Sequence, residues 1–559
     1  MLAGRTALTG TRADGVPTDS TATRAGRFAF VHAYGLGVAA ISAALAAFLL
    51  LQAIHWPPHE DETLVYFVSR QPLSELFSTV FEERGGAPLH FLLAHFVSAA
   101  WPSLTGLRLI SVAFAVASVP VIAALVVRLT DRWTALVATA IAAASWMVVY
   151  HGIYARMYSL FLFTSALSFL LLLRALEGQS RWRWVAWAAA TLAAIATQPY
   201  GAFVLAAAIV FVVARRRWAR TPLRPALVAF GAVFLLALPL WLVYRVLADR
   251  FDVGVTGSSG SKLGSPLDVL SYLVQVAGDF TAGWTPTVAV VLLVALLGMV
   301  VLSRTRLDAA ALAGAVVLVP TAAFLVTRSG GSVSLESRHL IFALPLFAMA
   351  VAAGLLTAAR LARRWAPAAA VAGLALLLVG EVAWGWHRTP WMYGGEPQVR
   401  KVARERAATW LAATSRGDDV LFGYEPLYVD ALEDGAPIGK VIVQRADPKL
   451  ALDTLGEAAK PLGRGVWVFD ATDQLDASKQ RFTVSGVSPG PQFEARAFGP
   501  FLVVRTKTRT LTAETFLRDT AVVEYQGTLI GIGDAGLNYQ TAVTALSRLL
   551  EGNASSESS

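Results

Sequence analysis

Long apolar runs separated by short polar segments occupy the first 386 residues of the chain. Several of these runs exceed the roughly 18 residues that a helix needs to cross a bilayer. The pattern predicts a polytopic α-helical membrane protein with about eleven spans. Seven expected spans cover residues 28–54, 107–129, 133–150, 159–176, 226–247, 340–359 and 367–386, and the others end near Gln198, Arg215, Arg304 and Arg328.

Shorter apolar segments lie in the loop that follows the first run, from residue 55 to 107. Pro88–Trp101 is apolar but too short for a span, so we expect a re-entrant or interfacial helix. Leu64–Ser69 and Leu73–Phe81 mix apolar and polar positions, as helices in the membrane interface do. An amphipathic helix is also expected at Pro266–Phe280.

The basic residues predict how the chain is oriented. Arg24 and Arg27 precede the first span and place the N-terminus in the cytoplasm. Nearly every later basic cluster then also falls inside, whereas counting Pro88–Trp101 as a span would put Arg215–Arg217 outside. The net charge of +9 therefore reflects membrane topology, and no nucleic-acid partner is expected. The loop 55–107 emerges on the outer face.

The composition changes after the last apolar run, and residues 387–552 have ordinary charge density. Arg400–Thr414 has the pattern of an amphipathic helix, and short buried strands are expected at Val420–Tyr424, Val441–Gln444, Val466–Phe469 and Phe501–Arg505. This alternation predicts a small extracytoplasmic α/β domain behind a transmembrane domain of residues 28–386. The polar ends, residues 1–27 and 553–559, are expected to be disordered.

Three consecutive carboxylates, Glu60, Asp61 and Glu62, follow the first span. Charged groups beside a membrane are costly to place and are functional candidates, although a polar helix end in water is the simpler alternative. Partial desolvation raises the pKa of a carboxylate toward neutrality, which suits a general base. The outer face also carries Glu82, Glu83 and Glu336.

Several cations are expected on the same face, and converging arginines suit a phosphate, which guanidinium binds with two hydrogen bonds. Carboxylates and arginines together indicate transfer chemistry on a lipid-linked phosphate. For any one arginine, extension toward the lipid headgroups is the simpler explanation. The candidates are Arg84, Arg108, Arg156, Arg245, Lys262, Arg328, Arg338 and His339.

Several segments, in order, resemble motifs of the GT-C glycosyltransferases. The nearest pattern is that of the dolichyl-phosphate-mannose protein mannosyltransferase family and its bacterial relatives, including the lipid A aminoarabinose transferase. Asp61-Glu62 resembles the Asp-Glu motif of the family's first outer loop. The other matching segments are Gly86–Leu93, Leu107–Leu109, Tyr150–Tyr158, Thr197–Gly201 and Ser337–Leu346, so the resemblance covers about residues 30–360.

Three departures from the family pattern affect residues near the site. Gly86-Ala87 replaces His-Pro, Ile153-Tyr154 replaces Gln-Glu, and Gln198 replaces a histidine. They leave the acceptor and any metal open, but Asp61, Arg156 and Arg338 match.

The resemblance implies transfer of a sugar from a polyprenyl-monophosphate donor to an acceptor hydroxyl, with inversion at the anomeric carbon. Asp61 is then the expected general base, and Glu62 orients it or tunes its pKa by repulsion. Cations stabilise the leaving phosphate. Arg156 and Arg338 are the first choices for this role, followed by Arg108, Arg245 and Lys262.

A pocket for the sugar or the acceptor is expected beside these charges. Its candidate residues are His90, Tyr154, Tyr158, Gln198 and Tyr200, although tyrosines also pack at membrane interfaces. Without cysteine the chain has no thiolate chemistry, and the sequence identifies no cofactor with certainty. A divalent metal remains possible, but the spacing of His59, His90 and His95 is irregular for ligands.

Two other classes of function are compatible with a membrane protein of this kind. A transporter of lipid-linked sugars needs polar groups deep in several spans, whereas these spans are nearly pure Ala, Leu and Val. A membrane-anchored scaffold with a glycan-binding outer domain does not account for the ordered motifs. The acceptor could be a glycan, a lipid or a protein. The Ala, Arg, Gly and Val richness indicates a high-GC bacterium and its plasma membrane.

Overall fold

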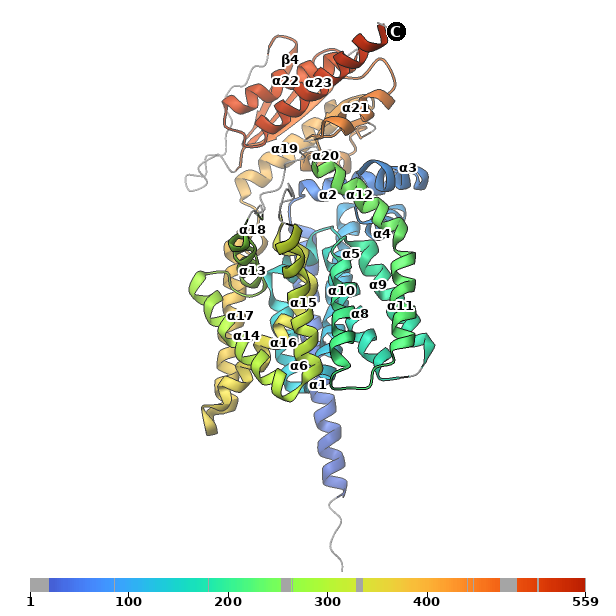
Figure 1. The fold of residues 1–559 in the computed structure, drawn as a ribbon. Coiled ribbons are helices and arrows are strands. Elements are labelled where there is room, and N and C mark those ends of the chain that lie inside the picture. The colour runs from blue at the N-terminus through green and yellow to red at the C-terminus, as the bar shows by residue number, and fades with distance from the viewer. Residues whose placement is uncertain are drawn as a thin grey trace, which may run out of the picture.

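The computed structural model describes residues 20–84, 86–178, 180–252, 263, 265–327, 335–439, 441–445, 447–472, 490–509 and 512–557. A bundle of long helices carries a smaller domain of helices and strands at one end (Figure 1). The protein is therefore a multi-pass helical membrane protein with a C-terminal α/β domain, as the sequence predicts.

Within the described residues, seven helical segments are long and apolar enough to cross a bilayer. They are α1 (Ser20–His55), α5 (Leu104–Leu129), α8 (Tyr158–Leu176), α14 (Thr285–Thr305), α15 (Leu307–Thr327), η2 with α16 (Ser337–Ala343, Leu344–Arg360) and η3 with α17 (Arg363–Trp365, Ala366–Arg388). Two bent pairs bring the number to nine if each pair is one span. The other two expected spans correspond to the shorter helices α9 (Arg181–Thr197) and α10 (Gly201–Arg215).

Both bent pairs lie where the sequence predicts a single span. Helices α6 (Arg132–Ala144) and α7 (Trp146–Ile153) meet at 53°, because Ser145 between them has an extended ψ of 131°. Helices α11 (Leu223–Leu236) and α12 (Leu238–Asp252) meet at 48°. The first bend redirects α7, which leads into the loop that carries Tyr154 and Arg156.

Two glycines allow a close approach between α14 and α16. A Cβ atom added to Gly298 would lie 1.9 Å from the carbonyl oxygen of Ala350, and one added to Gly354 would lie 1.9 Å from that of Val294. Small residues at such contacts are typical of helix packing in membranes. This contact packs α14 directly against α16.

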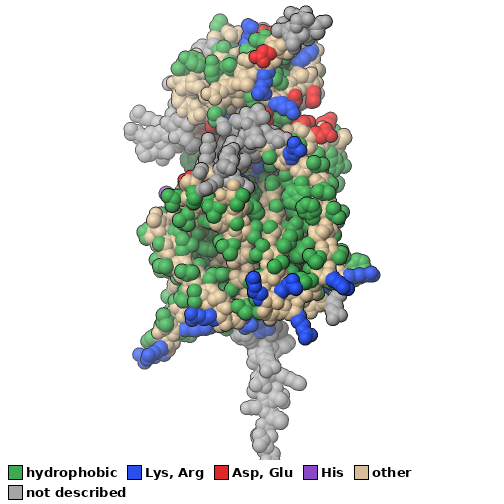
Figure 2. Space-filling view, viewed as in Figure 1, with side chains coloured by type: hydrophobic (Ala, Val, Ile, Leu, Met, Phe, Trp, Pro, Cys, Tyr) green, Lys and Arg blue, Asp and Glu red, His purple; other side chains and the backbone are tan. Residues whose placement is uncertain are grey.

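The short elements gather at the end of the bundle that carries the C-terminal domain (Figure 1). They are α2 (Glu60–Ser69), α3 (Leu73–Ser78), the π-helical η1 (Thr79–Arg84), α4 (Pro88–Ala100), α13 (Pro266–Phe280) and α18 (Pro390–Gly394). Lysine and arginine side chains cluster at the opposite end in the view of Figure 2. This asymmetry is the one on which the predicted orientation depends.

The C-terminal domain contains one mixed sheet with the order β2-β1-β3-β5-β4. Strands β1 (Val420–Phe422), β2 (Val441–Val443) and β3 (Gly465–Asp470) are parallel, and β5 (Phe501–Thr506) is antiparallel to β3 and to β4 (Phe493–Phe498). The four expected strands are present. The sequence pattern missed β4, because the middle of this edge strand is exposed and partly charged.

Helices cover both faces of the sheet. Alternate residues of β3 pack in opposite directions, Trp467 and Phe469 toward one core and Val466 and Val468 toward the other, as expected for a strand. Helices α19 (Gln398–Thr414) and α20 (Pro426–Glu433) lie on the Val466 face, and α21 (Pro448–Glu457), α22 (Ala513–Leu529) and α23 (Ala535–Glu557) lie on the other.

The two ends of the chain are more helical than the sequence predicts. Helix α1 begins at Ser20, before the expected first span, and α23 continues to Glu557. Residues 20–27 and 553–557 are thus helical in the structure, and the expected disorder of residues 1–27 and 553–559 stays a prediction. Residues 1–19 and 558–559 lie outside the described residues.

Helix α2 and the start of α5 contact the C-terminal domain. Arg445 of the C-terminal domain forms an ion pair with Glu60, with 2.9 Å between Nε and Oε1. The Leu104 amide donates to Glu433 Oε1 at 2.9 Å, and Val429 packs in one cluster with Val65. The C-terminal domain thus contacts the segment that begins with the three carboxylates.

We expect the C-terminal domain to lose stability as the pH rises, because burial raises the pKa of Glu524 from 4.5 to about 8. The folded form keeps a proton that the unfolded chain loses above pH 4.5, so stability falls between about pH 5 and 8, by up to about 1.4 kcal/mol per pH unit. Hydrogen exchange of α22 peptides in the full-length protein measures this slope. Glu524→Gln should flatten it and Glu514→Gln, in an exposed ion pair on α22, should not; equal slopes in all three proteins would contradict the expectation.

Candidate active site

The three carboxylates at the start of α2 point in three directions, because successive residues of a helix are about 100° apart. His59 caps the helix, since its Nδ1 accepts from the Asp61 amide at 3.2 Å and its own amide donates to Glu62 Oε2 at 3.2 Å. Glu60 points to the C-terminal domain, Asp61 to the loop before α8, and Glu62 into the bundle. The sequence pattern alone does not separate these roles.

Glu62 and Arg108 form a buried ion pair. Arg108 donates to the two Glu62 oxygens at 2.9 and 2.6 Å, and both side chains are almost fully buried. Its other contacts are the carbonyl oxygens of Ala53, Trp56 and Pro57, at 3.1, 2.6 and 2.9 Å. The Ala155 amide donates to Glu62 Oε1 at 2.9 Å.

These contacts correct two expectations from the sequence. Arg108 is not available for a donor phosphate, because its guanidinium is buried and bonded to Glu62 and to main-chain carbonyls. Glu62 has no side-chain contact with the Asp61 carboxylate within the described residues, because its oxygens accept from Arg108 and from the Ala155 amide. The pair instead holds the ends of α1, α2 and α5 together.

Asp61 lies among two arginines and a tyrosine. Tyr154 Oη donates to Asp61 Oδ2 at 2.8 Å. Arg156 Nη1 lies 3.5 Å from Oδ1, and Arg338 Nη1 lies 3.8 Å from Oδ2. The Asp61 side chain is 32% exposed, so one side of the carboxylate is open.

The charges around Asp61 hold its pKa well below the usual range. Burial alone would raise the pKa, but Arg156, Arg338 and His59, together with the Tyr154 hydrogen bond, outweigh it. The expectation that desolvation brings the pKa of Asp61 toward neutrality is therefore wrong for the protein without ligand. Burial raises the pKa of Tyr154 well above its usual value, so this hydroxyl stays a donor.

Arg156 and Arg338 each have a buried N–H donor without a hydrogen-bond partner among the described residues. Arg156 comes from the loop between α7 and α8, and its buried Nε has no partner among the described residues. Arg338 comes from η2, where it contacts Glu336 at 2.7 Å and lies 5.1 Å above the Tyr158 ring, and its Nε is likewise buried without a partner. Buried donors without partners are uncommon and mark a place where an anion fits.

The position of Arg338 depends on Asp279, which was not singled out from the sequence. Ser337 Oγ donates to Asp279 Oδ2 at 2.6 Å, and Trp384 Nε1 donates to Oδ1 at 3.2 Å. Asp279 ends the amphipathic helix α13, where an acid on an apolar face was the available signal. Burial raises the pKa of Asp279 despite these bonds and the nearby Arg388.

Two of the expected pocket residues, Tyr158 and Tyr200, form an aromatic cluster with His339 beside Arg338. The His339 ring stacks on Tyr200, with 4.9 Å between centroids, and lies 6.3 Å from the Tyr158 ring. Gln198 is buried at the end of α9, two residues before Tyr200. Burial and the charge of Arg156 lower the pKa of His90 to about 3, so His90 is neutral. Tyr154 contacts Asp61 directly, as described above.

The remaining candidates lie apart from this group or cannot be placed. Arg245 is exposed on α12, a helix that packs against η1. Lys262 and Arg328 lie outside the described residues. Over the described ranges, no three His, Asp or Glu side chains are grouped to hold a metal ion. His95 bonds to the Ser69 carbonyl at 3.0 Å and His59 to Tyr154 at 2.8 Å, so the histidines do not converge.

Glu62→Gln should destabilise the protein by about 3–5 kcal/mol, because it leaves the Arg108 charge buried without a counter-ion. The free energy of unfolding in detergent measures this change. Glu177→Gln is the matched control, since its ion pair with Arg128 is about half exposed and should contribute at most about 1 kcal/mol. A Glu62 variant as stable as the control variant would rule out the structural role.

Comparisons with known proteins show which family and which fold this chain resembles. Residues 87–244 match the family model of the dolichyl-phosphate-mannose-protein mannosyltransferases. ArnT from Cupriavidus metallidurans in the apo state has a similar structure, with a TM-score of 0.55 and 15% identity over 84% of this chain and 97% of that chain. Its complex with undecaprenyl phosphate gives a TM-score of 0.53 and 13% identity over the same shares. No curated protein matches in sequence. Residues 87–244 thus share the sequence pattern of this family, and the chain shares the fold of ArnT.

Proposed function

We propose that the protein transfers a sugar from a polyprenyl-monophosphate donor to an acceptor hydroxyl, at the end of the bundle that carries the C-terminal domain. The observation that carries this proposal is the Asp61 carboxylate between Arg156 and Arg338, both with a buried Nε that has no partner among the described residues. The undecaprenyl phosphate in the structure of the similar protein supports the class of donor.

Arg156 and Arg338 bind the donor phosphate in this proposal. A guanidinium offers paired N–H groups that match two phosphate oxygens. The polyprenyl chain extends along the apolar helices, and the sugar lies toward Tyr158 and Tyr200. As the bond between the anomeric carbon and the phosphate oxygen breaks, the two arginines stabilise the charge that moves onto the phosphate.

Asp61 accepts the proton of the acceptor hydroxyl. Its low pKa makes it a weak base while both arginines face it. A bound phosphate shares the arginine charges, so the pKa of Asp61 rises as the donor binds. The acceptor oxygen then attacks the anomeric carbon from the face opposite the phosphate, and its proton moves to Asp61. Tyr154 holds Oδ2, so the proton moves to Oδ1, which Arg156 faces at 3.5 Å until the phosphate binds that arginine.

The orientation of the protein follows from the distribution of basic residues. Lysine and arginine gather at the end of the bundle opposite the C-terminal domain (Figure 2). That end is cytoplasmic by the positive-inside rule. The site and the C-terminal domain then lie on the outer face of a bacterial plasma membrane.

Asp61→Asn should abolish transfer while the protein still folds and inserts, because the amide keeps the shape but cannot take a proton. Release of radiolabelled sugar from a panel of polyprenyl-phosphate sugars measures transfer, and thermal unfolding verifies the fold. Turnover close to that of the unchanged protein would contradict the role of Asp61.

Arg156→Ala should mainly impair use of the donor, with a rise of about tenfold or more in the KM for the polyprenyl-phosphate sugar, since a charge-assisted phosphate contact is lost. Arg304→Ala, at the basic end of α14, is the matched control and should change little. If only the KM for the acceptor rose, the phosphate-binding role of Arg156 would be wrong.

A further inference from the structure

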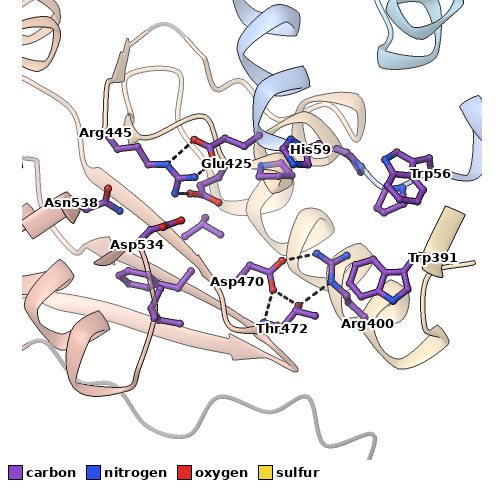
Figure 3. A pocket seen from close by; sticks show the side chains of 17 residues that line it. Trp56, His59, Trp391, Arg400, Glu425, Arg445, Asp470, Thr472, Asp534 and Asn538 are labelled. Atoms are coloured by element: carbon purple, nitrogen blue, oxygen red, sulfur yellow. Dashed lines mark hydrogen bonds and ion pairs between the residues drawn. The ribbon is translucent and has the colours of Figure 1, made fainter. Parts of the chain in front are cut away.

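A cavity of about 320 Å³ lies between the C-terminal domain and the segment before α2. This volume is within the range of small-molecule sites, roughly 300–1,000 Å³. Trp56, His59 and Glu60 line it on the membrane side, together with Trp391. Figure 3 shows the two tryptophans on one side of the cavity and Arg445, Asp534 and Asn538 on the other.

The position of the cavity follows from the topology of the sheet. Glu425, Arg445 and Thr472 line it, and each follows the carboxyl end of one of the parallel strands β1, β2 and β3. The chain leaves β1 in one direction to β2 and returns across β1 to β3, with α20 and α21 on opposite faces of the sheet. In α/β sheets, ligands bind in the crevice at such a reversal.

The charges in the cavity differ from those around Asp61. Both of its arginines are already paired: Arg445 contacts Glu60 at 2.9 Å and Glu425 at 2.5 Å, and Arg400 contacts Asp470 at 2.6 Å. Arg400 also contacts Glu396 and donates to Thr472 at 3.0 Å. The charged lining residues are the carboxylates Glu60, Glu425, Asp470 and Asp534 and the cations Arg400 and Arg445.

Asp534 has no ion-pair or hydrogen-bond partner for its carboxylate within the described part of the chain. It stands beside Arg445 and Asn538 in Figure 3. Excess carboxylate repels an anion, whereas carboxylates, an amide and a hydroxyl can bond to the hydroxyl groups of a sugar. The tryptophans and prolines of the lining supply apolar surface for the C–H faces of sugar rings.

One side chain connects the cavity to the Asp61 site. His59 lines the cavity, and its Nδ1 lies 2.8 Å from Tyr154 Oη, which donates to Asp61. The cavity and the Asp61 carboxylate therefore lie near each other, separated by His59 and Tyr154.

We propose that this cavity binds the acceptor and that the acceptor is an uncharged glycan. This inference rests on the proposed transferase function and adds the class of acceptor to it. The unpaired arginine Nε donors beside Asp61 fit the donor phosphate, and the surplus of carboxylates in the cavity on the other side of His59 fits neutral sugar residues and disfavours acceptors with phosphate or carboxylate groups.

The test is calorimetric titration of the full-length protein in detergent with neutral oligosaccharides of two to four hexose or pentose residues. Oligomers of uronic acids of the same lengths are titrated in parallel. We expect saturable binding of at least one neutral series, with uronic-acid oligomers at least about tenfold weaker, as like-charge repulsion requires. No binding by any neutral member, or equal binding of the uronic-acid oligomers, would overturn the proposal.

Asp534→Asn should weaken binding of the neutral glycan about tenfold, because a charge-assisted hydrogen bond becomes a neutral one. Asp453→Asn, exposed on α21 and outside the cavity, is the matched control and should leave the affinity unchanged. Trp391→Ala should also weaken binding. Unchanged affinity in both cavity variants would show that the glycan binds elsewhere.

The two proposals fail in different ways. Asp61→Asn, which should transfer no sugar, should still bind the neutral glycan saturably, because the Asp61 side chain does not line the cavity. Glycan binding that depends on Asp534 in a protein that transfers no sugar would refute the transferase and leave the cavity assigned. Transfer with an acceptor KM that does not respond to Asp534→Asn would refute the cavity and leave the transferase.

Discussion

The buried ion pair between Glu62 and Arg108 is the interaction on which the site depends. It joins α2 to α5, and the remaining Arg108 donors bond to the carbonyl oxygens of Ala53, Trp56 and Pro57. Glu62 also accepts from the Ala155 amide, next to Arg156. One buried pair thus sets both the position of the Asp61 backbone and that of the loop that brings Arg156 to it. Replacing either partner would leave a charge in the interior without compensation.

The adjacent carboxylates Glu60 and Asp61 have different electrostatic surroundings. Asp61 faces two arginines whose buried Nε atoms have no partner among the described residues, which suits a phosphate. Glu60, one residue earlier, faces Arg445 in a cavity with more carboxylates than arginines, which suits neutral hydroxyl groups. His59 lies between the two surroundings. In the proposed reaction, the donor phosphate and the acceptor glycan therefore bind to different charged groups on the two sides of His59.

Hydropathy predicts the helices of the bundle well, because apolar length is a local property of the sequence. Alternation predicts the buried strands, but not β4, whose middle is exposed. The order of motifs brings Asp61, Arg156 and Arg338 to attention, and the structure places them together. The sequence could not show that Arg108 is ion-paired with Glu62, because the two residues lie 46 positions apart and burial is a property of the fold. For the same reason, the direction of the Asp61 pKa and the contribution of Asp279 required the structure.

A structure of the protein with bound undecaprenyl phosphate would show directly whether Arg156 and Arg338 hold the donor phosphate. We expect a cryo-electron microscopy map to show the phosphate within hydrogen-bonding distance of both guanidinium groups, with the buried Nε atoms engaged and the lipid tail along the apolar helices. A phosphate bound elsewhere, with both arginines still turned only toward Asp61, would contradict the assignment of the phosphate to Arg156 and Arg338.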